Sequence, residues 1–229
     1  MALDSLTRGN EANGINSVKL HTALISYERF EILKRSVASY LETVSVPHTL
    51  VVVDNGSSKQ VKNWLLEEYD YGVILLHENR YPGFACNRGW ELAPKDADFF
   101  HRADNDFIYR EGWCEEVAER FQDRKLGQLG LLTDEEEAWA PGNVGGNNVI
   151  RRELWEKGLR YNETPWPELE PGFSEDSYLS PLVLGMGYKW GRVQRTCIDG
   201  ISTPDPKDTY YKKSYADRNI SHILKGIKT

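Results

Sequence analysis

Along the first hundred residues, short apolar runs alternate with segments in which apolar residues recur every three or four positions. The runs have the length of buried strands, whereas the spaced pattern is typical of amphipathic helices. Strands are expected at Val18–Ile25, Leu50–Val53, Val73–Leu76 and Asp98–Ala103, with helices around residues 30–41, 61–65 and 84–92. This alternation predicts an α/β fold, in which a mostly parallel sheet is flanked by helices.

The second half of the chain follows a less regular pattern. Three prolines between Thr164 and Gly172 argue against regular structure there. Short strands are expected at residues 129–132, 188–193 and 196–198, and a loop in the Gly- and Asn-rich segment 142–148. Helices are expected around residues 113–121, from Arg151 onward, and after Ser174, where Leu179, Leu182, Val183 and Met186 form an apolar stripe.

Length and charge divide the chain further. Its 229 residues suit a single domain. We place that domain at residues 18–203, after a flexible N-terminal segment at 1–17 and before a basic C-terminal tail or lid at 204–229. The net charge is −7, but from Lys207 onward six Lys or Arg stand against two Asp. The acidic body disfavours nucleic acid as a partner, and the basic tail is either a solvated end or a contact for phosphate, a membrane surface or an acidic substrate.

The cysteines and apolar runs bear on the compartment. Cys86, Cys114 and Cys197 form no CxxC pair, which suits a reducing compartment and argues against a disulfide framework. Residues 1–17 lack the apolar core of a secretory signal, and no apolar run approaches the roughly 20 residues that a membrane span needs. We therefore expect a cytoplasmic protein with no transmembrane segment, either free or peripheral to a membrane.

The candidate chemistry centres on the segment Arg102-Ala103-Asp104-Asn105-Asp106. Alternate residues of an extended segment point the same way, so Asp104 and Asp106 can face one ion. Carboxylate oxygens select hard cations such as Mg²⁺ or Mn²⁺, which bridge the phosphates of a nucleotide. The alternative is an Asp-Asn-Asp turn without a metal. The place of the pair at the end of a parallel strand favours the metal site, because ligands bind at that edge of such sheets.

Further polar groups follow other expected strand and helix boundaries. Asp54, after an apolar run, either accepts from the N–H of a nucleobase or only shapes a turn. Glu175 and Asp176 either complement a helix dipole or supply a general base for an acceptor hydroxyl. The Gly- and Asn-rich loop either presents amides to a sugar or acceptor or is a flexible hairpin; its candidate residues are Gly146, Asn147 and Asn148.

In this order, the segments resemble the family 2 glycosyltransferases of the GT-A fold, over about residues 20–203. The resemblance rests on residues 25–29, 53–57, 79–89, 104–106, 111–113, 145–152 and 175–176. Within residues 79–89 the Asn and Arg of the family's N-x-G-x-a-x-x-R-N segment are exchanged. The resemblance implies transfer of a hexose from a nucleotide-sugar, a UDP-sugar first of all, with inversion and with Mn²⁺ or Mg²⁺ as cofactor.

The resemblance also implies roles for individual residues. The donor would contact Ser26, Tyr27, Arg29, Asp54, Gly83, Arg88, Asp104 and Asn105, with the first three lining the base pocket and Asp54 holding the nucleobase. The metal would bind Asp104 and Asp106. Asp176 would be the base, beside Glu175. Many relatives complete the metal site with a late His; here Asp199 stands at that place, so we expect Asp199 as the third ligand, with His222 as the alternative.

Two other functions use similar residues. A nucleotidyltransferase would need a Gly-rich loop near the first strand, but residues 24–30 contain no glycine. A catalytically silent module that binds nucleotide-sugars would keep the fold and lose the chemistry. The sequence leaves the acceptor open between a saccharide, a lipid-linked glycan and a small molecule, with a modified base in DNA as a minority option.

Overall fold

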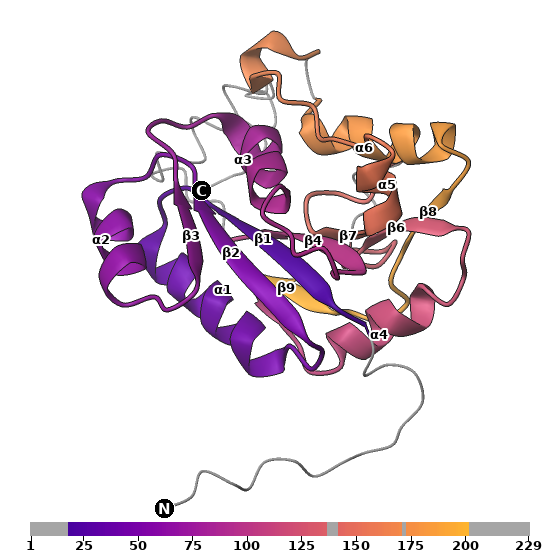
Figure 1. The fold of residues 1–229 in the computed structure, drawn as a ribbon, viewed down its shortest axis with the longest axis horizontal. Helices are drawn as coiled ribbons and strands as arrows, with labels where there is room; N and C mark the ends of the chain where they lie inside the picture. Colours follow the sequence, from indigo (N-terminus) through magenta and orange to yellow (C-terminus); the bar gives the residue numbers. More distant parts are fainter. Residues whose placement is uncertain (1–17, 137–141, 171–172, 202–229) are drawn as a thin grey trace, which may run out of the picture.

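The structure, a computed structural model, describes residues 18–136, 142–170 and 173–201 of the chain. Seven strands form one sheet in the order β3-β2-β1-β4-β7-β6-β8 (Figure 1). Of these, β7 runs antiparallel to its neighbours β4 and β6, and the other pairings are parallel. The strands are β1 (Leu20–Ser26), β2 (His48–Asp54), β3 (Gly72–Leu75), β4 (Phe99–Asp104), β6 (Leu126–Gly130), β7 (Asn148–Arg151) and β8 (Lys189–Arg192). The predicted mostly parallel sheet with flanking helices is confirmed.

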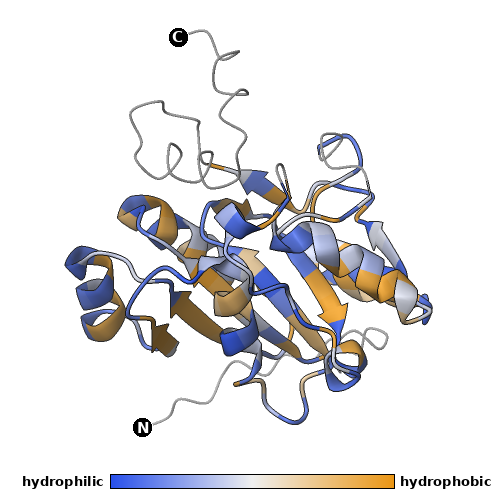
Figure 2. Ribbon diagram, turned by 90° about the horizontal axis from the view of Figure 1, so that it is seen from above, coloured by the Kyte–Doolittle hydropathy of each residue, from blue (hydrophilic) through white to orange (hydrophobic). Residues whose placement is uncertain are grey.

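Helices cover both faces of this sheet. One face packs against α1 (Phe30–Thr43), α2 (Lys59–Glu67) and α4 (Trp113–Arg120). The other packs against α3 (Tyr81–Trp90), α5 (Arg152–Glu156) and α6 (Glu175–Gly185). In Figure 2 several helices are orange on the side toward the sheet and blue on the side toward solvent. This is the pattern that an amphipathic helix needs when it covers a sheet.

Successive residues of the central strands belong alternately to the cores on the two faces of the sheet. On β1, Leu24 belongs to the α1 side of the core, and its neighbour Ala23 belongs to the α3 side. On β2, Val52 and Val53 divide in the same way. Because successive side chains of a strand point to opposite faces, a strand buried on both sides reads as one continuous apolar run. That is why these runs were visible in the sequence.

Several boundaries differ from the sequence predictions. β6 begins at Leu126, three residues before the predicted start, and the segment after Pro165 forms a short 3-10 helix, Trp166–Glu168, where no regular structure was expected. A small sheet of β5 (Phe107–Tyr109) and β9 (Ile198–Gly200) was not foreseen as a pair. In α6, Leu179 and Val183 are buried, but Leu182 is 47% exposed, so its place in the apolar stripe was wrong.

Candidate functional site

The carboxyl ends of the central parallel strands bring three of the predicted donor residues to one edge. In the ladder between β1 and β2, Ser26 pairs with Asp54. In the ladder between β1 and β4, Ile25 pairs with Asp104. Ser26, Asp54 and Asp104 therefore end three adjacent strands, at the edge where parallel sheets bind their ligands.

Asp54 both shapes a turn and keeps one oxygen free. Its side chain is fully buried, and its Oδ2 accepts a hydrogen bond from the Ser57 N–H at 3.2 Å. Its Oδ1 has no hydrogen-bond partner among the described residues. Burial raises the pKa of this carboxyl, and the bonds to Ser57 oppose the rise. The structure is thus compatible with both hypotheses for Asp54: Oδ2 shapes the turn, and Oδ1 has no partner among the described residues and could accept from a nucleobase.

The loop after β1 is tied to the turn after β2. Glu28 and Arg29 adopt the left-handed conformation, with φ of 53° and 57°. The Glu28 N–H donates to Ser57 Oγ at 2.8 Å, and Glu28 Oε1 accepts from the Ser58 N–H at 2.9 Å. Tyr27 lies half-buried in the same loop. The predicted base-pocket loop and the Asp54 turn are therefore neighbours.

Each carboxylate of the Asp104/Asp106 pair has an arginine partner. Arg102 lies 3.2 Å from Asp104 Oδ1, and Arg29 Nη1 lies 3.0 Å from Asp106 Oδ2. The second oxygen of each aspartate makes no hydrogen bond or ion pair with the described residues. Burial raises the pKa of Asp104 to about 6, although Arg102 acts in the opposite direction.

The Gly- and Asn-rich loop reaches the same place. Asn147 Oδ1 accepts from the Asp104 N–H and from the Tyr109 hydroxyl, both at 3.2 Å. A Cβ on Gly146 would lie 2.2 Å from Asp104 Oδ2, so only glycine lets the loop lie against this carboxylate. Asn148, in contrast, is fully buried and donates to the Gly145 carbonyl and the Tyr161 hydroxyl. Gly146 and Asn147 thus lie against Asp104, and Asn148 holds the loop in shape.

The two acids at the start of α6 have different surroundings. Glu175 is 2% exposed, and both of its oxygens are engaged: Oε1 lies 2.7 Å from Arg102 Nη1, and Oε2 accepts from Trp166 Nε1 at 2.6 Å. Asp176 is half-buried and accepts a hydrogen bond from the Ser174 hydroxyl. Of the two acids, Asp176 is therefore the more exposed.

Arg88, Gly83 and Asp199, which were predicted as site residues, each have a close partner within the protein. Arg88 lies 2.9 Å from Glu91 and 3.3 Å from Glu163, so its charge is directed to acidic side chains. A Cβ on Gly83 would lie 2.1 Å from the Asn162 carbonyl oxygen, so the close approach at Gly83 is made by the protein's own backbone.

Asp199 lies on β9 and pairs with Arg110 through both carboxylate oxygens. Within the described ranges, no three His, Cys, Asp or Glu side chains are grouped so as to hold a metal ion. The structure therefore does not bring Asp199 together with Asp104 and Asp106. His222 and the tail lie outside the described residues.

Sequence reasoning missed Arg102 and Trp166, which hold the two acids Asp104 and Glu175 in place. A signal for Arg102 was present, because it interrupts the buried run Phe99–Ala103, and a buried charge needs a partner. Trp166 gave no such signal, since its segment is irregular.

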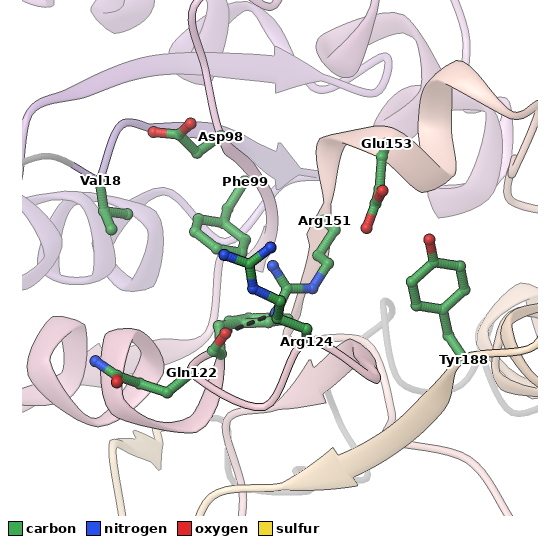
Figure 3. A pocket seen from close by; sticks show the side chains of 9 residues that line it. Val18, Asp98, Phe99, Gln122, Arg124, Arg151, Glu153 and Tyr188 are labelled. Atoms are coloured by element: carbon green, nitrogen blue, oxygen red, sulfur yellow. Dashed lines mark hydrogen bonds between the residues drawn. The ribbon is translucent and has the colours of Figure 1, made fainter.

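A separate depression lies at the opposite edge of the sheet. Its lining includes Val18 and Phe99, at the amino ends of β1 and β4, together with Arg124 and Arg151. Figure 3 shows the two guanidinium groups close together beside the ring of Phe99. No residue of the predicted donor or acceptor site lines this depression, so it is distinct from the Asp104 edge.

Residues 23–153 match the sequence model of glycosyl transferase family 2. The chain belongs to this family. The match includes Asp54, Asp104, Asp106 and Asn147, and it ends before Glu175. No curated protein matches this member of glycosyl transferase family 2 in sequence.

Solved structures show that the fold of this family 2 chain is of the GT-A type. The mannosyltransferase PcManGT from Pyrobaculum calidifontis, in complex with GDP-Man and Mn²⁺, matches with a TM-score of 0.65 and 16% identity over 92% of this chain and 65% of that one. Residues 1–349 of S. aureus TarS match with a TM-score of 0.60 and 15% identity over 79% and 60%. The chain thus spans less than two thirds of the structures it resembles. Among the described residues, no helix is long and apolar enough to cross a membrane.

Proposed function

We propose that this chain transfers a sugar from a nucleoside-diphosphate sugar to a hydroxyl group of an acceptor, with inversion at the anomeric carbon. The observation that carries the proposal is a set of buried polar atoms without partners near the ends of the central strands. Within the described residues, these atoms include Ser26 Oγ, Asp54 Oδ1, Asn105 Nδ2 and Asn147 Nδ2. Buried polar groups in proteins are nearly always hydrogen-bonded, so a cluster of exceptions indicates a ligand.

The orphaned groups suit a nucleotide-sugar. Asp54 Oδ1 is an acceptor at the end of β2, which can bind the N–H of a nucleobase. Asn105 follows Asp104 in the chain, and Asn147 accepts from the Asp104 N–H; both offer side-chain N–H donors that suit phosphate or sugar oxygens. We propose a UDP-sugar as the first candidate donor. GDP-mannose is the second, because PcManGT was solved with GDP-Man.

The Asp104/Asp106 pair fits Mn²⁺ or Mg²⁺. Each aspartate keeps one carboxylate oxygen free of the described protein groups, and two carboxylates together with substrate phosphates make a common magnesium-type donor set. When bound, such an ion would stabilise the negative charge that develops on the departing diphosphate. Asp199 remains our hypothesis for a third ligand, and it would first have to release Arg110.

The chain's own residues supply the rest of the proposed reaction. Asp176 takes the proton from the acceptor hydroxyl, and that oxygen forms a bond to the anomeric carbon as the bond to the diphosphate oxygen breaks. Direct displacement of this kind inverts the anomeric centre and leaves no sugar on the enzyme. Gly146 and Asn147, which lie beside Asp104, remain our candidates for contacts with the transferred sugar or the acceptor.

The test is a thermal-shift panel of UDP-, GDP- and dTDP-sugars, each with and without Mn²⁺. A ligand present at 100 times its Kd stabilises the folded state by about 2.7 kcal/mol, which is readily measured. We expect one nucleotide class to raise the melting temperature only with Mn²⁺, and a variant with Asp104 and Asp106 both changed to Asn to lose the shift. No shift with any nucleotide-sugar would overturn the proposal. Binding without release of nucleoside diphosphate would identify a silent binding module instead.

A further inference from the structure

Arg102 is a buried charge in the middle of a core strand. It lies on β4 between His101 and Ala103, and its side chain is 3% exposed. An arginine stays protonated even when buried, so its charge has to be matched by acidic partners nearby. The N–H groups of its guanidinium contact two such partners, Asp104 on the same strand and Glu175 at the start of α6.

The first partner belongs to the proposed donor side. Both Nε and Nη2 of Arg102 lie 3.2 Å from Asp104 Oδ1. The second partner belongs to α6: Nη1 lies 2.7 Å from Glu175 Oε1. The guanidinium also stacks on the ring of Tyr161, 4.9 Å from its centroid, which fixes the plane of the fork.

Glu175 is the first residue of α6, and the proposed base Asp176 is the second. Glu175 is held from its other side by Trp166, so its carboxylate has one fixed position between the indole and the guanidinium. The start of α6 is therefore tied to the end of β4 through a single planar group. Among the described residues, this is the one ion pair that joins β4 to α6.

We propose that Arg102 is a positioning residue for glycosyl transfer, which sets the place of Asp176 relative to the donor held at Asp104. This inference rests on the proposed function. Misplacing a reacting group by about 1 Å can cost roughly 100-fold in rate. A residue that fixes the distance between donor and base acts on the rate of transfer, and it acts far less on the affinity for the donor.

The decisive variant is Arg102→Lys, which keeps the buried positive charge. A lysine ammonium is a single point donor, and it lacks the planar fork that reaches both carboxylates at once. We expect kcat for transfer to fall by about 10- to 100-fold, while the KM for the donor changes less than about threefold. The matched control is Arg124→Lys. Arg124 is exposed and forms no ion pair with the described residues, so its variant should keep wild-type kcat.

A second readout separates positioning from folding. Hydrogen exchange of the α6 amides is measured with and without the nucleoside diphosphate that gave the largest thermal shift, together with Mn²⁺. In the wild type, we expect ligand binding at Asp104 to slow exchange in the first turn of α6. In Arg102→Lys the ligand should still bind, shown by its own thermal shift, and the slowing in α6 should be lost.

The outcomes distinguish this inference from the function on which it rests. If the wild type neither binds nucleotide nor transfers sugar, the proposed function fails and the inference fails with it. If the wild type is active and Arg102→Lys keeps both its kcat and the response of α6, the inference alone is overturned. A loss of kcat that only follows the loss of folded protein, judged by the melting curve, also overturns it.

Discussion

At the scale of single residues, the adjacent acids Glu175 and Asp176 differ in their partners, although the sequence considered them together as candidates for the base. Glu175 has no free carboxylate oxygen, because Arg102 and Trp166 each take one. Among the described residues, the side chain of Asp176 forms a hydrogen bond only with the Ser174 hydroxyl, and it is half-buried. The structure thus gives Glu175 a role in packing, and we propose the role of general base for Asp176 alone.

The role of Asp176 is tested by Asp176→Asn. Removing a general base costs about 10² to 10⁴ in rate, so we expect kcat to fall in that range, with the affinity for the donor kept. The matched variant Glu175→Gln should lower the melting temperature as well as kcat, because Arg102 would lose a charged partner in a buried site. Transfer by Asp176→Asn at the wild-type rate would show that another group is the base.

The partly buried carboxyl of Asp104 predicts a pH-dependent stability. Its pKa in the folded protein is raised from 3.8 to about 6, mainly by burial. The ionised form therefore costs the folded state free energy at pH above 6. That cost fades as pH falls through 6 and is absent below about 4, where the folded and unfolded states are both protonated.

We accordingly expect Asp104→Asn to unfold at a higher denaturant concentration than the wild type at pH 8. The difference should be about 1 to 3 kcal/mol, since one pKa unit corresponds to 1.36 kcal/mol, and it should shrink toward zero at pH 4. Urea unfolding at the two pH values measures this. A variant that is equally destabilised at both would show that Asp104 holds the fold together.

The sequence could locate Asp104 and Asp106, because an apolar run ending in two alternating carboxylates is a local pattern. It could not show that Arg29 pairs with Asp106, since that pairing depends on how the loop after β1 meets the turn after β4. The pairing of Arg102 with Asp104 is local, because both residues lie on β4 and alternate residues of a strand face the same way. The role of Asp199 was inferred from its place in the sequence, where many relatives carry a late His. Its bidentate pairing with Arg110 arises from the register of β5 and β9, which no local pattern contained.

At the scale of elements, the packing of α3 against the chain after α5 explains Gly83. A Cβ there would overlap the Asn162 carbonyl oxygen and come within 3.1 Å of Glu175 Cβ. The sequence interpretation gave the same glycine a different task, close approach to the nucleotide. The two interpretations make different predictions for one substitution.

Gly83→Ala should destabilise the protein by about 1 to 3 kcal/mol, because backbone and helix have to move apart. The matched control is Gly185→Ala near the end of α6, where a Cβ meets nothing within 4 Å, and where alanine should be neutral or stabilise by up to about 1 kcal/mol. Denaturant unfolding gives both values. If Gly83→Ala folded as stably as the wild type but lost nucleotide binding, the interpretation from the sequence would be the right one.

Elements were predictable where their pattern was long. The apolar runs of β1 and β2 and the spaced apolar residues of α1 are set by burial on both faces of the sheet. The three-residue strands β5 and β9 are too short for any periodicity to show. In α6 the exposed Leu182 shows that an apolar side chain can be placed on either side of a short helix without a change in the pattern.

At the scale of the whole molecule, the alternation of strand and helix predicted the parallel half of the sheet. Strands β1 to β4 are joined by α1, α2 and α3, and such crossovers keep neighbouring strands parallel. The order β4-β7-β6-β8 has no equivalent signal, because β7 is inserted between β4 and β6 in the antiparallel direction. The contact of the Asn147 loop with Asp104 depends on that insertion.

The last prediction concerns the proposed boundary of the domain at residue 203. Among the described residues, the last strand ends at Gly200 and no helix follows it. Removing residues 204–229 should therefore leave the melting temperature within a few degrees of the wild type. If the basic tail contributes its charge to the donor diphosphate, the truncated chain should have a higher KM for the donor. The difference in KM between the truncated chain and the full chain should be smaller at high salt, because dissolved ions screen such contacts in the full chain as well. The matched control is the full chain with Lys207, Lys212, Lys213 and Arg218 changed to Gln, which should reproduce the effect if charge is the cause. A truncated chain with wild-type kcat and KM would show that residues 1–203 contain the whole of the donor site.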